Sequence, residues 1–424
     1  MLRFKNANIL TYADGKFSVS DGVLETENDR ISHIGTAPTE KPADRTIDLH
    51  GTGLIMPSFK NAHAHSAMTF LRSYADDLPL DKWLNGRVFP MEAKINGEDI
   101  FTFARLGFLE YLRNGITSSF DMYFMPDFLA KAAADIGFRL VICGAVNNFR
   151  ESPEQLEDCY IRLNKMSDLI SFRLGFHAEY TTSEDILKAV ADLSHKYSAP
   201  VFTHCSETAS EVNACIARHG LTPPMYFDRL GLLDNGGGFF HCVHVTDEDI
   251  KTMKKRNIAA VLNPCSNTKL ASGIAPVAKL LANVRVGIGT DGPAGNNALD
   301  MFREMYLAAS LPKLALSDAA AVNAEDILYA ATAGSAEIMG LSDCTSLTVG
   351  MKADMAVIDL DCPNMRPLLN IPKNLVYSGN PSNVAMTVLN GNIVYEHGGF
   401  HLPNCTADDI IRDAEKAVQS IKNK

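Results

Sequence analysis

Four side chains with the chemistry of metal ligands each stand at the end of a short apolar run. His63 and His65 are separated by one residue, so on a strand their two imidazoles point the same way. His204 and Asp291 end two later runs. Imidazole and carboxylate ligands together suit a divalent cation with one position left for water. The pattern predicts one metal site built from His63, His65, His204 and Asp291.

A glutamate and two further histidines stand close to these positions in the sequence. Glu207 follows His204 by three residues, although a carboxylate at the start of a helix is also favoured by the helix dipole. His241 lies in an apolar run, where it can equally be a core histidine bonded to backbone. His244 is interpreted as such a structural residue. Glu207 and His241 are therefore acid–base candidates with a structural alternative.

The elements that position these residues follow from the hydrophobic pattern. Short β-rich runs alternate with longer amphipathic stretches such as residues 183–197, which carry apolar residues at helical spacing. This alternation is typical of a parallel sheet, and eight strands match an α/β TIM barrel, whose active site lies at the carboxyl ends of the strands. The eight runs are residues 53–61, 115–123, 138–146, 172–178, 200–204, 238–245, 258–263 and 284–290.

Short β segments with turn signals flank this core on both sides, and a final helix is expected over residues 407–421. The two flanks are similar in character although far apart in sequence. We predict a TIM (β/α)8 barrel over residues 57–345, a small composite β-sandwich domain from residues 1–56 and 346–405, and a C-terminal helix in residues 406–424.

Composition excludes several classes of protein. The 424 residues are 46% hydrophobic and 21% charged, which argues against disorder and fibrous repeats. The net charge of -11 disfavours nucleic acid and anionic membrane as partners. No run is long and apolar enough for a membrane span, and the first residues are too polar for a signal peptide. We expect a cytoplasmic protein whose nine cysteines, without a Cys-x-x-Cys pair, are reduced and mostly buried.

Several segments together resemble the amidohydrolase superfamily. The resemblance is greatest to the branch of S-adenosylhomocysteine and methylthioadenosine deaminases, with triazine hydrolases and guanine deaminases more distant. The matching segments are residues 61–78, 83–84, 89–94, 202–208, 241–244, 263–267, 273–276, 289–297 and 350–359. They span nearly the whole chain and are more specific for the superfamily than for a substrate.

The resemblance implies a metal-dependent deamination. One divalent ion, with zinc favoured and Fe²⁺ or Mn²⁺ also accepted by such ligands, makes hydroxide available by lowering the pKa of bound water. The fourth run and the residues after it, 172–180, hold no lysine that could bridge two metals. Asp291 accepts a proton, His241 orients or polarises the nucleophile, and Glu207 protonates a ring nitrogen and then the leaving amine.

The resemblance also implies residues that contact the substrate. Glu92 corresponds to a glutamate that grips ribose hydroxyls, with an exposed helix residue as the alternative. His177 corresponds to a histidine near the purine or ribose. Trp83, the only tryptophan, either lines the pocket or belongs to the core.

Three positions depart from the family pattern. Cys143 stands where related deaminases place an arginine for an amino-acid carboxylate, and Arg150 lies close enough in sequence to compensate. Leu262 and Gly295 replace a histidine and a serine near the ring-binding wall. The first departure favours a neutral 5′-substituted adenosine, and the other two leave room for another aminated heterocycle.

The leading hypothesis is a deaminase of adenosine-type nucleosides: 5′-methylthioadenosine, 5′-deoxyadenosine, adenosine or S-adenosylhomocysteine. An alternative is a hydrolase of a free aminated heterocycle such as guanine, 8-oxoguanine or a triazine. A third, less favoured, is a non-catalytic scaffold. The expected partner is a small purine nucleoside, without nucleic acid or membrane, and resembling proteins are commonly homodimers or homotetramers.

Overall fold

The computed structural model describes residues 1–78 and 80–422, with only the backbone described at residues 80 and 81. Its centre is an eight-stranded parallel sheet in which each strand pairs with the next along the chain. Between the last and first strands the Asp291 amide donates to the His63 carbonyl at 3.0 Å, which nearly closes the barrel. The predicted TIM barrel is thus confirmed. Its strands are β6 (Phe59–Ala64), β7 (Ile116–Met122), β8 (Arg139–Cys143), β9 (Ile170–Gly175), β10 (Val201–Cys205), β11 (Gly237–His241), β12 (Ile258–Leu262) and β13 (Val286–Ile288).

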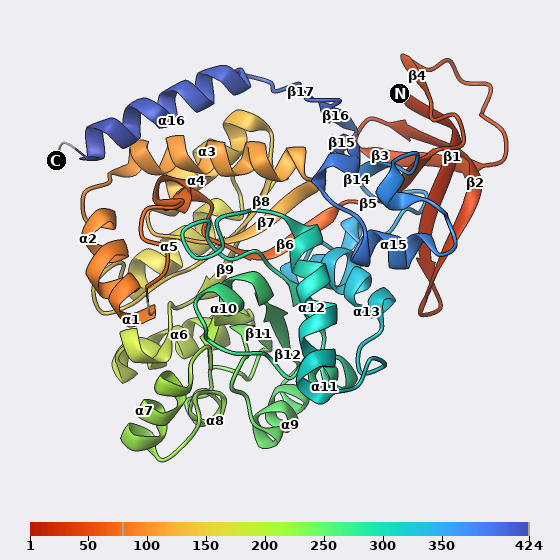
Figure 1. Ribbon diagram of the computed structural model, residues 1–424. Coiled ribbons are helices and arrows are strands. Elements are labelled where there is room, and N and C mark those ends of the chain that lie inside the picture. Colours follow the sequence, from red (N-terminus) through yellow and green to blue (C-terminus); the bar gives the residue numbers. More distant parts are fainter. Residues whose placement is uncertain (79, 423–424) are drawn as a thin grey trace.

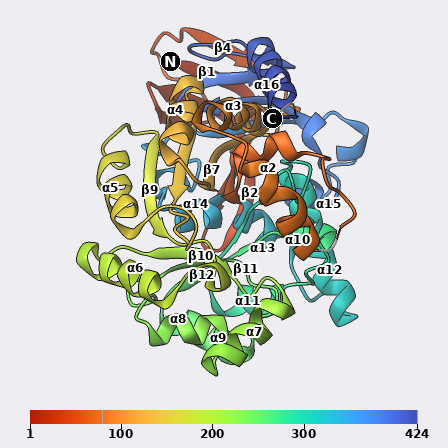
Figure 2. The same cartoon turned by 90° about the vertical axis from the view of Figure 1, so that its left-hand side faces the viewer.

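Amphipathic helices surround the strands (Figure 2). Side-chain caps begin several of them: Asn96, Ser152 and Thr208 each accept a backbone N–H of the first turn in a capping box. The helices are α1 (Leu80–Trp83), α2 (Phe89–Glu92), α3 (Gly97–Arg113), α4 (Pro126–Ile136), α5 (Pro153–Leu163), α6 (Glu184–Tyr197), α7 (Ala209–His219), α8 (Pro223–Arg229), α9 (Asp247–Lys255), α10 (Pro264–Lys269), α11 (Val277–Asn283), α12 (Met301–Leu316), α13 (Ala324–Tyr329), α14 (Ser335–Met339), α15 (Ile371–Tyr377) and α16 (Ala407–Lys422).

The interior of the barrel is a packed core rather than a channel. Phe120 lies edge-on to both Phe202 and Phe240, at centroid distances of 4.7 and 5.7 Å. Ile338 and Met339, from α14, belong to the same buried cluster. Because apolar side chains fill the middle of the barrel, the polar site lies at the carboxyl ends of the strands.

A second, nine-stranded sheet is built from both ends of the chain, as the sequence predicts for the composite β unit. β5 (Gly53–Pro57) pairs with β1 on one side and with β14 on the other. This sheet lies beside the barrel in Figure 1, and α16 extends over α3. Its other strands are β1 (Leu2–Ala13), β2 (Lys16–Glu27), β3 (Arg30–Gly35), β4 (Arg45–Asp48), β14 (Met355–Asp359), β15 (Val384–Leu389), β16 (Asn392–Glu396) and β17 (Gly399–Phe400).

One expected strand is wrong. Residues 53–61 were expected to form a single barrel strand, but the chain changes sheets at Ser58. The Ser58 amide donates to the Asp354 carbonyl, whereas the Phe59 amide donates to the Gly115 carbonyl. Pro57, which has no N–H, ends β5 and eases this change of partner. Apolar residues stand on both sides of Pro57-Ser58, so the hydrophobic pattern alone does not reveal the junction.

Four further strands are shorter than expected. β8 ends at Cys143 instead of Val146, β9 at Gly175 instead of Ala178, and β11 at His241 instead of Val245. β13 covers only Val286–Ile288 of the expected residues 284–290. All nine cysteines have free thiols and six are buried.

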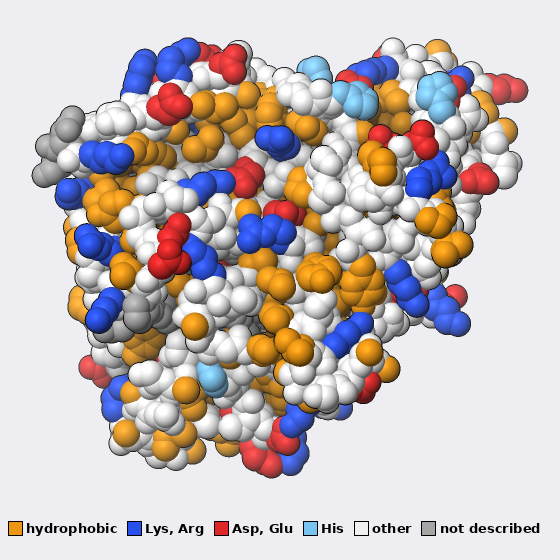
Figure 3. All heavy atoms as spheres, viewed as in Figure 1, with side chains coloured by type: hydrophobic (Ala, Val, Ile, Leu, Met, Phe, Trp, Pro, Cys, Tyr) orange, Lys and Arg blue, Asp and Glu red, His pale blue; other side chains and the backbone are white. Residues whose placement is uncertain are grey.

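Charges of both signs are interspersed with apolar side chains on the face shown in Figure 3. Within the described residues, every helix is too short or too polar to cross a lipid bilayer.

Candidate metal centre and active site

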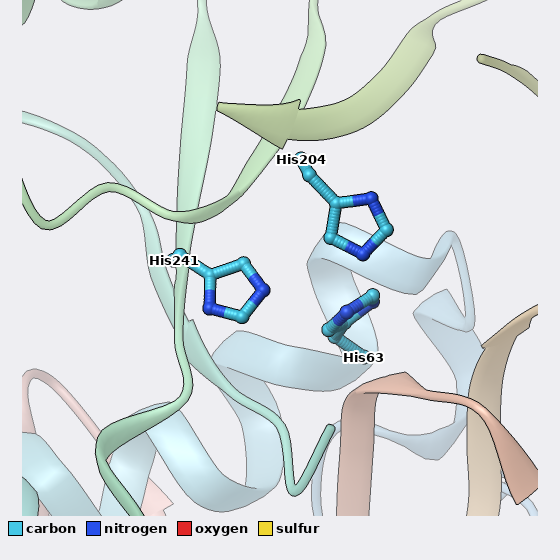
Figure 4. A group of neighbouring side chains, drawn as sticks. All are labelled: His63, His204 and His241. Carbon is cyan, nitrogen blue, oxygen red and sulfur yellow. The ribbon is translucent and has the colours of Figure 1, made fainter. Parts of the chain in front are cut away.

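The carboxyl ends of the barrel strands bring the predicted ligands together. His63 comes from β6, His204 from β10 and His241 from the last residue of β11, and their rings converge (Figure 4). Ring nitrogens of these three lie within 4.8 Å of one another. A second group meeting the same limit consists of His63, His65 and Asp291. The two groups share His63 and are joined by a direct approach of His65 to His204, so the five side chains form one cluster.

Two of the histidines are oriented through backbone carbonyls. His65 Nδ1 bonds the Met122 carbonyl, and His204 Nδ1 bonds the His177 carbonyl at 2.7 Å. A carbonyl only accepts, so both Nδ1 atoms carry hydrogen, and the neutral form of either ring has its lone pair on Nε2. These two Nε2 atoms face each other at 3.3 Å. Such a pair requires a positive charge between or upon the rings, as a bound cation supplies.

His63 shows the need for a bound cation more directly. Its ring is completely buried and stacks on Phe240 at a centroid distance of 3.9 Å. Neither ring nitrogen has a hydrogen-bond partner among the described residues. Burial, together with the charge of His65, holds the pKa of His63 well below its usual value, so the ring is neutral. A buried imidazole with a free lone pair fits a metal ligand.

Asp291 supplies the negative charge. Its Oδ1 lies 3.2 Å from His65 Nε2 and 3.6 Å from His63 Nε2. Its Oδ2 accepts the Ser266 hydroxyl at 2.5 Å. Burial would raise the pKa of Asp291, but the adjacent histidines outweigh it and hold the pKa well below its usual range. Burial would likewise lower the pKa of His65, yet Asp291 raises it to about 9. The carboxylate thus attracts either a proton or a metal cation to the centre.

The two acid–base candidates lie next to each other on one side of this centre. His241 Nδ1 bonds Asn267 Oδ1 at 2.8 Å, and its Nε2 lies 3.9 Å from Glu207 Oε2. The Ser272 hydroxyl donates to the other oxygen of Glu207. Burial, followed by repulsion from Asp291, raises the pKa of Glu207 against the opposing charge of His241. Glu207 is therefore suited to hold a proton for delivery.

Backbone strain coincides with these side chains. Ser206, His241 and Asp291 have φ values of 54°, 72° and 59°, in the left-handed region that non-glycine residues avoid. Each stands where a strand has just ended or is ending. Such strain persists only where surrounding contacts hold it, and it is frequent at functional sites.

A cavity of about 790 Å³ lies between α2, α4 and α5, and its described lining contains none of the candidate metal ligands. Glu92 and Arg150 both line it. Glu92 is 6% exposed and accepts the Tyr123 hydroxyl at 2.7 Å, so it is not the exposed helix residue of the alternative interpretation. The Arg150 guanidinium lies 3.7 Å above the Phe124 ring.

The other two expected substrate contacts differ in position. The His177 ring lies 5.0 Å from the His204 ring, and burial lowers its pKa to about 4, so it is neutral. Its Nδ1 bonds the Thr181 hydroxyl. Trp83 is buried in the main hydrophobic cluster and is absent from the cavity lining. The structure thus brings His177 to the metal cluster and gives Trp83 a core environment.

Comparison with known proteins agrees with this geometry. The model of the amidohydrolase family matches residues 54–394. The chain belongs to the amidohydrolase family. A 5′-deoxyadenosine deaminase of Methanobrevibacter smithii is 36% identical over 99% of this chain and 97% of its own. A 5-methylthioadenosine/S-adenosylhomocysteine deaminase of Thermoanaerobacter pseudethanolicus is 35% identical over 99% of both chains. The crystal structure of a zinc-bound adenosine deaminase from Xanthomonas campestris has a TM-score of 0.92 at 30% identity and covers 100% of this chain and 99% of its own.

The three departures from the amidohydrolase pattern have distinct surroundings. Cys143 is fully buried in the barrel interior, and Leu262 ends β12. At Gly295 a Cβ would stand 3.2 Å from Ser266 Oγ and 3.7 Å from Asp291 Oδ2. Glycine therefore leaves space for the hydroxyl that donates to Asp291.

Sequence reasoning assigned no role to Tyr123, Ser266, Asn267 or Ser272, which hold the site residues by hydrogen bonds. Ser266 and Asn267 stand in the segment 263–267 that carries the amidohydrolase resemblance, which was the available signal. Their contacts depend on how α10 faces the barrel, which a single sequence does not specify. His244 bonds the Ser272 carbonyl, as a structural histidine would.

Proposed function

We propose that this amidohydrolase deaminates adenosine-type nucleosides to the corresponding inosine analogue and ammonia. The observation that carries the proposal is the convergence of four ligand side chains with a proton-holding glutamate at one barrel mouth. The names of the relatives, 5′-deoxyadenosine and methylthioadenosine/S-adenosylhomocysteine deaminases, supply the substrate class. The buried Glu92 beside the cavity supports a nucleoside in preference to a free base.

His63, His65, His204 and Asp291 would hold one divalent ion, with zinc favoured because a structural relative binds it. The unpartnered ring of His63 and the facing Nε2 atoms of His65 and His204 support this assignment. A divalent ion bound there lowers the pKa of water and so makes a nucleophile available at neutral pH. β9 carries no lysine to bridge a second ion.

The protein's own groups complete the proton transfers. Asp291 takes one proton from the attacking water, while Glu207 gives its proton to the ring nitrogen next to the amino-bearing carbon. His241, oriented by Asn267, holds the water in line for attack. As the carbon–nitrogen bond breaks, Glu207 collects the remaining water proton and passes it to the leaving amine, and the proton held by Asp291 then restores Glu207. One water is consumed and one ammonia leaves, so the protons balance.

The test is a substrate screen with zinc-loaded protein. 5′-Deoxyadenosine, 5′-methylthioadenosine, adenosine and S-adenosylhomocysteine, each at millimolar concentration, should lose adenine absorbance and release ammonia one to one. The proposal is overturned if none of the four nucleosides is turned over. Glu207→Gln should retain bound metal but lose about 10²- to 10⁴-fold in kcat. Glu184→Gln, on the outer helix α6, is the matched control and should leave kcat unchanged.

Glu92→Ala separates a nucleoside deaminase from a hydrolase of a free heterocycle. Loss of the carboxylate should greatly reduce turnover of nucleosides, because the ribose hydroxyls lose their acceptor. A free-base hydrolase would keep its activity on guanine or a triazine in the same variant. Parallel assays of adenosine and guanine with wild-type protein and Glu92→Ala therefore decide between the two substrate classes.

A further inference from the structure

The end of β7 connects two parts of the site through consecutive residues. The Met122 carbonyl orients His65 by bonding its Nδ1. The next residue, Tyr123, donates its hydroxyl to Glu92 Oε1 at 2.7 Å. The same strand end therefore positions both the proposed metal ligand His65 and the expected ribose acceptor Glu92.

Tyr123 is itself rigidly held. It is 4% exposed, and its ring stacks on Phe124 with centroids 4.4 Å apart. The Arg150 guanidinium in turn lies over Phe124. The Tyr123 ring is 6.4 Å from the His65 ring. Because neighbouring rings restrict Tyr123, its hydroxyl offers Glu92 a fixed donor.

Glu92 has one oxygen bound and one available. Among the described residues only Tyr123 donates a hydrogen bond to this carboxylate, and the cavity adjoins it. Burial raises the pKa of Glu92, and the Tyr123 hydrogen bond acts in the opposite direction by favouring the ionised form. The bond therefore fixes the position of the carboxylate and helps to keep it an acceptor.

We propose that Tyr123 is a positioning residue that fixes Glu92 relative to the metal ligands and thereby makes the ribose 2′,3′-diol a determinant of substrate specificity. The inference rests on the proposed nucleoside deaminase function. Within a nucleoside, covalent structure limits the distance between the ribose 2′,3′-diol and the amino-bearing ring carbon. Because adjacent residues Met122 and Tyr123 hold His65 and Glu92, the two side chains keep a constant relative position, and a diol-bearing substrate is bound in position for reaction.

The experiment compares adenosine with 2′,3′-dideoxyadenosine, which differ only in the diol. Tyr123→Phe should lower kcat/KM for adenosine about tenfold or more, since a hydrogen bond to a charged group is lost. The value for dideoxyadenosine should change less than about twofold, because that substrate does not engage Glu92. Tyr226→Phe is the matched control: Tyr226 is also buried and also donates to a glutamate, Glu184, on the outer helices. It should leave both values unchanged.

An equal fall for both substrates in Tyr123→Phe would overturn the proposal, because it would show a general structural effect. In the Glu92→Ala variant, adding Tyr123→Phe should not change the ratio of kcat/KM for adenosine to kcat/KM for dideoxyadenosine any further. If the Tyr123→Phe variant does not fold, the variants Glu92→Gln and Glu92→Ala are compared with each other instead. Gln, which still accepts the Tyr123 hydroxyl, should retain more preference for the diol than Ala, and equal ratios would overturn the proposal. Wild-type protein that deaminates neither nucleoside refutes the proposed function instead.

Discussion

The two ends of the barrel both bury polar side chains, but they treat them in opposite ways. At the amino end, fully buried Lys60 donates to the Ser58 carbonyl and hydroxyl and to Thr117. Arg139 makes two hydrogen bonds to Asp354. At the carboxyl end, neither nitrogen of His63 has a hydrogen-bond partner among the described residues, and Asp291 has a strained backbone. The charged side chains of the amino end are satisfied by partners within the chain, whereas the histidines of the carboxyl end are placed to bind something from outside it.

The difference teaches that burial of charge has two uses in one fold. The Arg139–Asp354 pair ties barrel strand β8 to the segment just before β14, so it joins the two sheets. Such a closed network contributes to stability and specificity of packing. The histidine cluster contains imidazole nitrogens that are unpaired among the described residues, and residues with unfavourable φ values, and both features suit it to binding.

The largest effect should come from Asp291→Asn. The amide keeps the shape but can neither accept a proton nor attract a cation, so kcat/KM should fall at least about 10³-fold. The free energy of unfolding should change by less than about 2 kcal/mol. Kinetics, metal analysis and urea denaturation measure these quantities. Asp234→Asn, which alters a surface pair with His195, is the control. Activity within tenfold of wild type would contradict the prediction.

At the opposite end, Asp354→Ala should reverse the pattern. It leaves the buried Arg139 guanidinium without its counter-ion, so the free energy of unfolding should fall by about 3–5 kcal/mol. The kcat/KM of the folded, metal-loaded fraction should stay within about twofold of wild type. Asp361→Ala, whose pair with Arg366 is exposed, should cost less than about 1 kcal/mol. A large loss of kcat/KM in the folded fraction would show that the two ends are not independent.

The two ends should also respond to pH with opposite signs. Burial raises the pKa of Glu304, beside Asn296 near the mouth, to about 8. Its contribution to stability is full below about pH 4.5 and is lost as pH rises towards 8, with a slope of up to about 1.4 kcal/mol per pH unit. Burial would raise the pKa of Asp354, but Arg139 and Lys60 lower it, so its contribution is lost only on acidification below about pH 4.

Unfolding free energies of wild type, Glu304→Gln and Asp354→Asn between pH 3 and 8 test these signs. Glu304→Gln should flatten the decline above pH 4.5, and Asp354→Asn should flatten the decline in acid. The measurement concerns the slope, so a lower absolute stability in either variant does not affect it. Identical slopes in all three proteins would refute the assignment.

The smallest effect is expected from Ser266→Ala. Removal of the hydroxyl that donates to Asp291 Oδ2 should lower kcat about three- to tenfold through a lost hydrogen bond. Metal stoichiometry should not change, because the proposed ligand Asp291 is retained. Thr268→Ala on the same helix, whose hydroxyl bonds the Pro264 carbonyl, is the control. A drop in bound metal would show that Ser266 contributes to binding rather than to orientation.

The sequence predicted much of this arrangement because ligand chemistry and strand ends are local features. His63, His65, His204 and Asp291 each follow an apolar run, and parallel strands bring their carboxyl ends to one rim. The division of residues 53–61 between two sheets was missed, because both sheets bury the same kind of residue there. Tyr123 and Ser266 were missed because a hydroxyl acquires its partner only through tertiary packing.

The position of β5 has a consequence for synthesis of the chain. β5 pairs with β14, whose first residue, Met355, follows Pro57 by roughly 300 residues. At about 5 to 20 residues per second, a ribosome needs on the order of 15 to 60 seconds to make that interval. During this time the edge of β5 that will pair with β14 is open, while the attached β6 gains its neighbour β7 about 60 residues after Pro57 and β13 about 230 residues after it. Nascent chains therefore pass through a stage in which the barrel can form beside an incomplete sheet, whose open edge is able to pair with another chain.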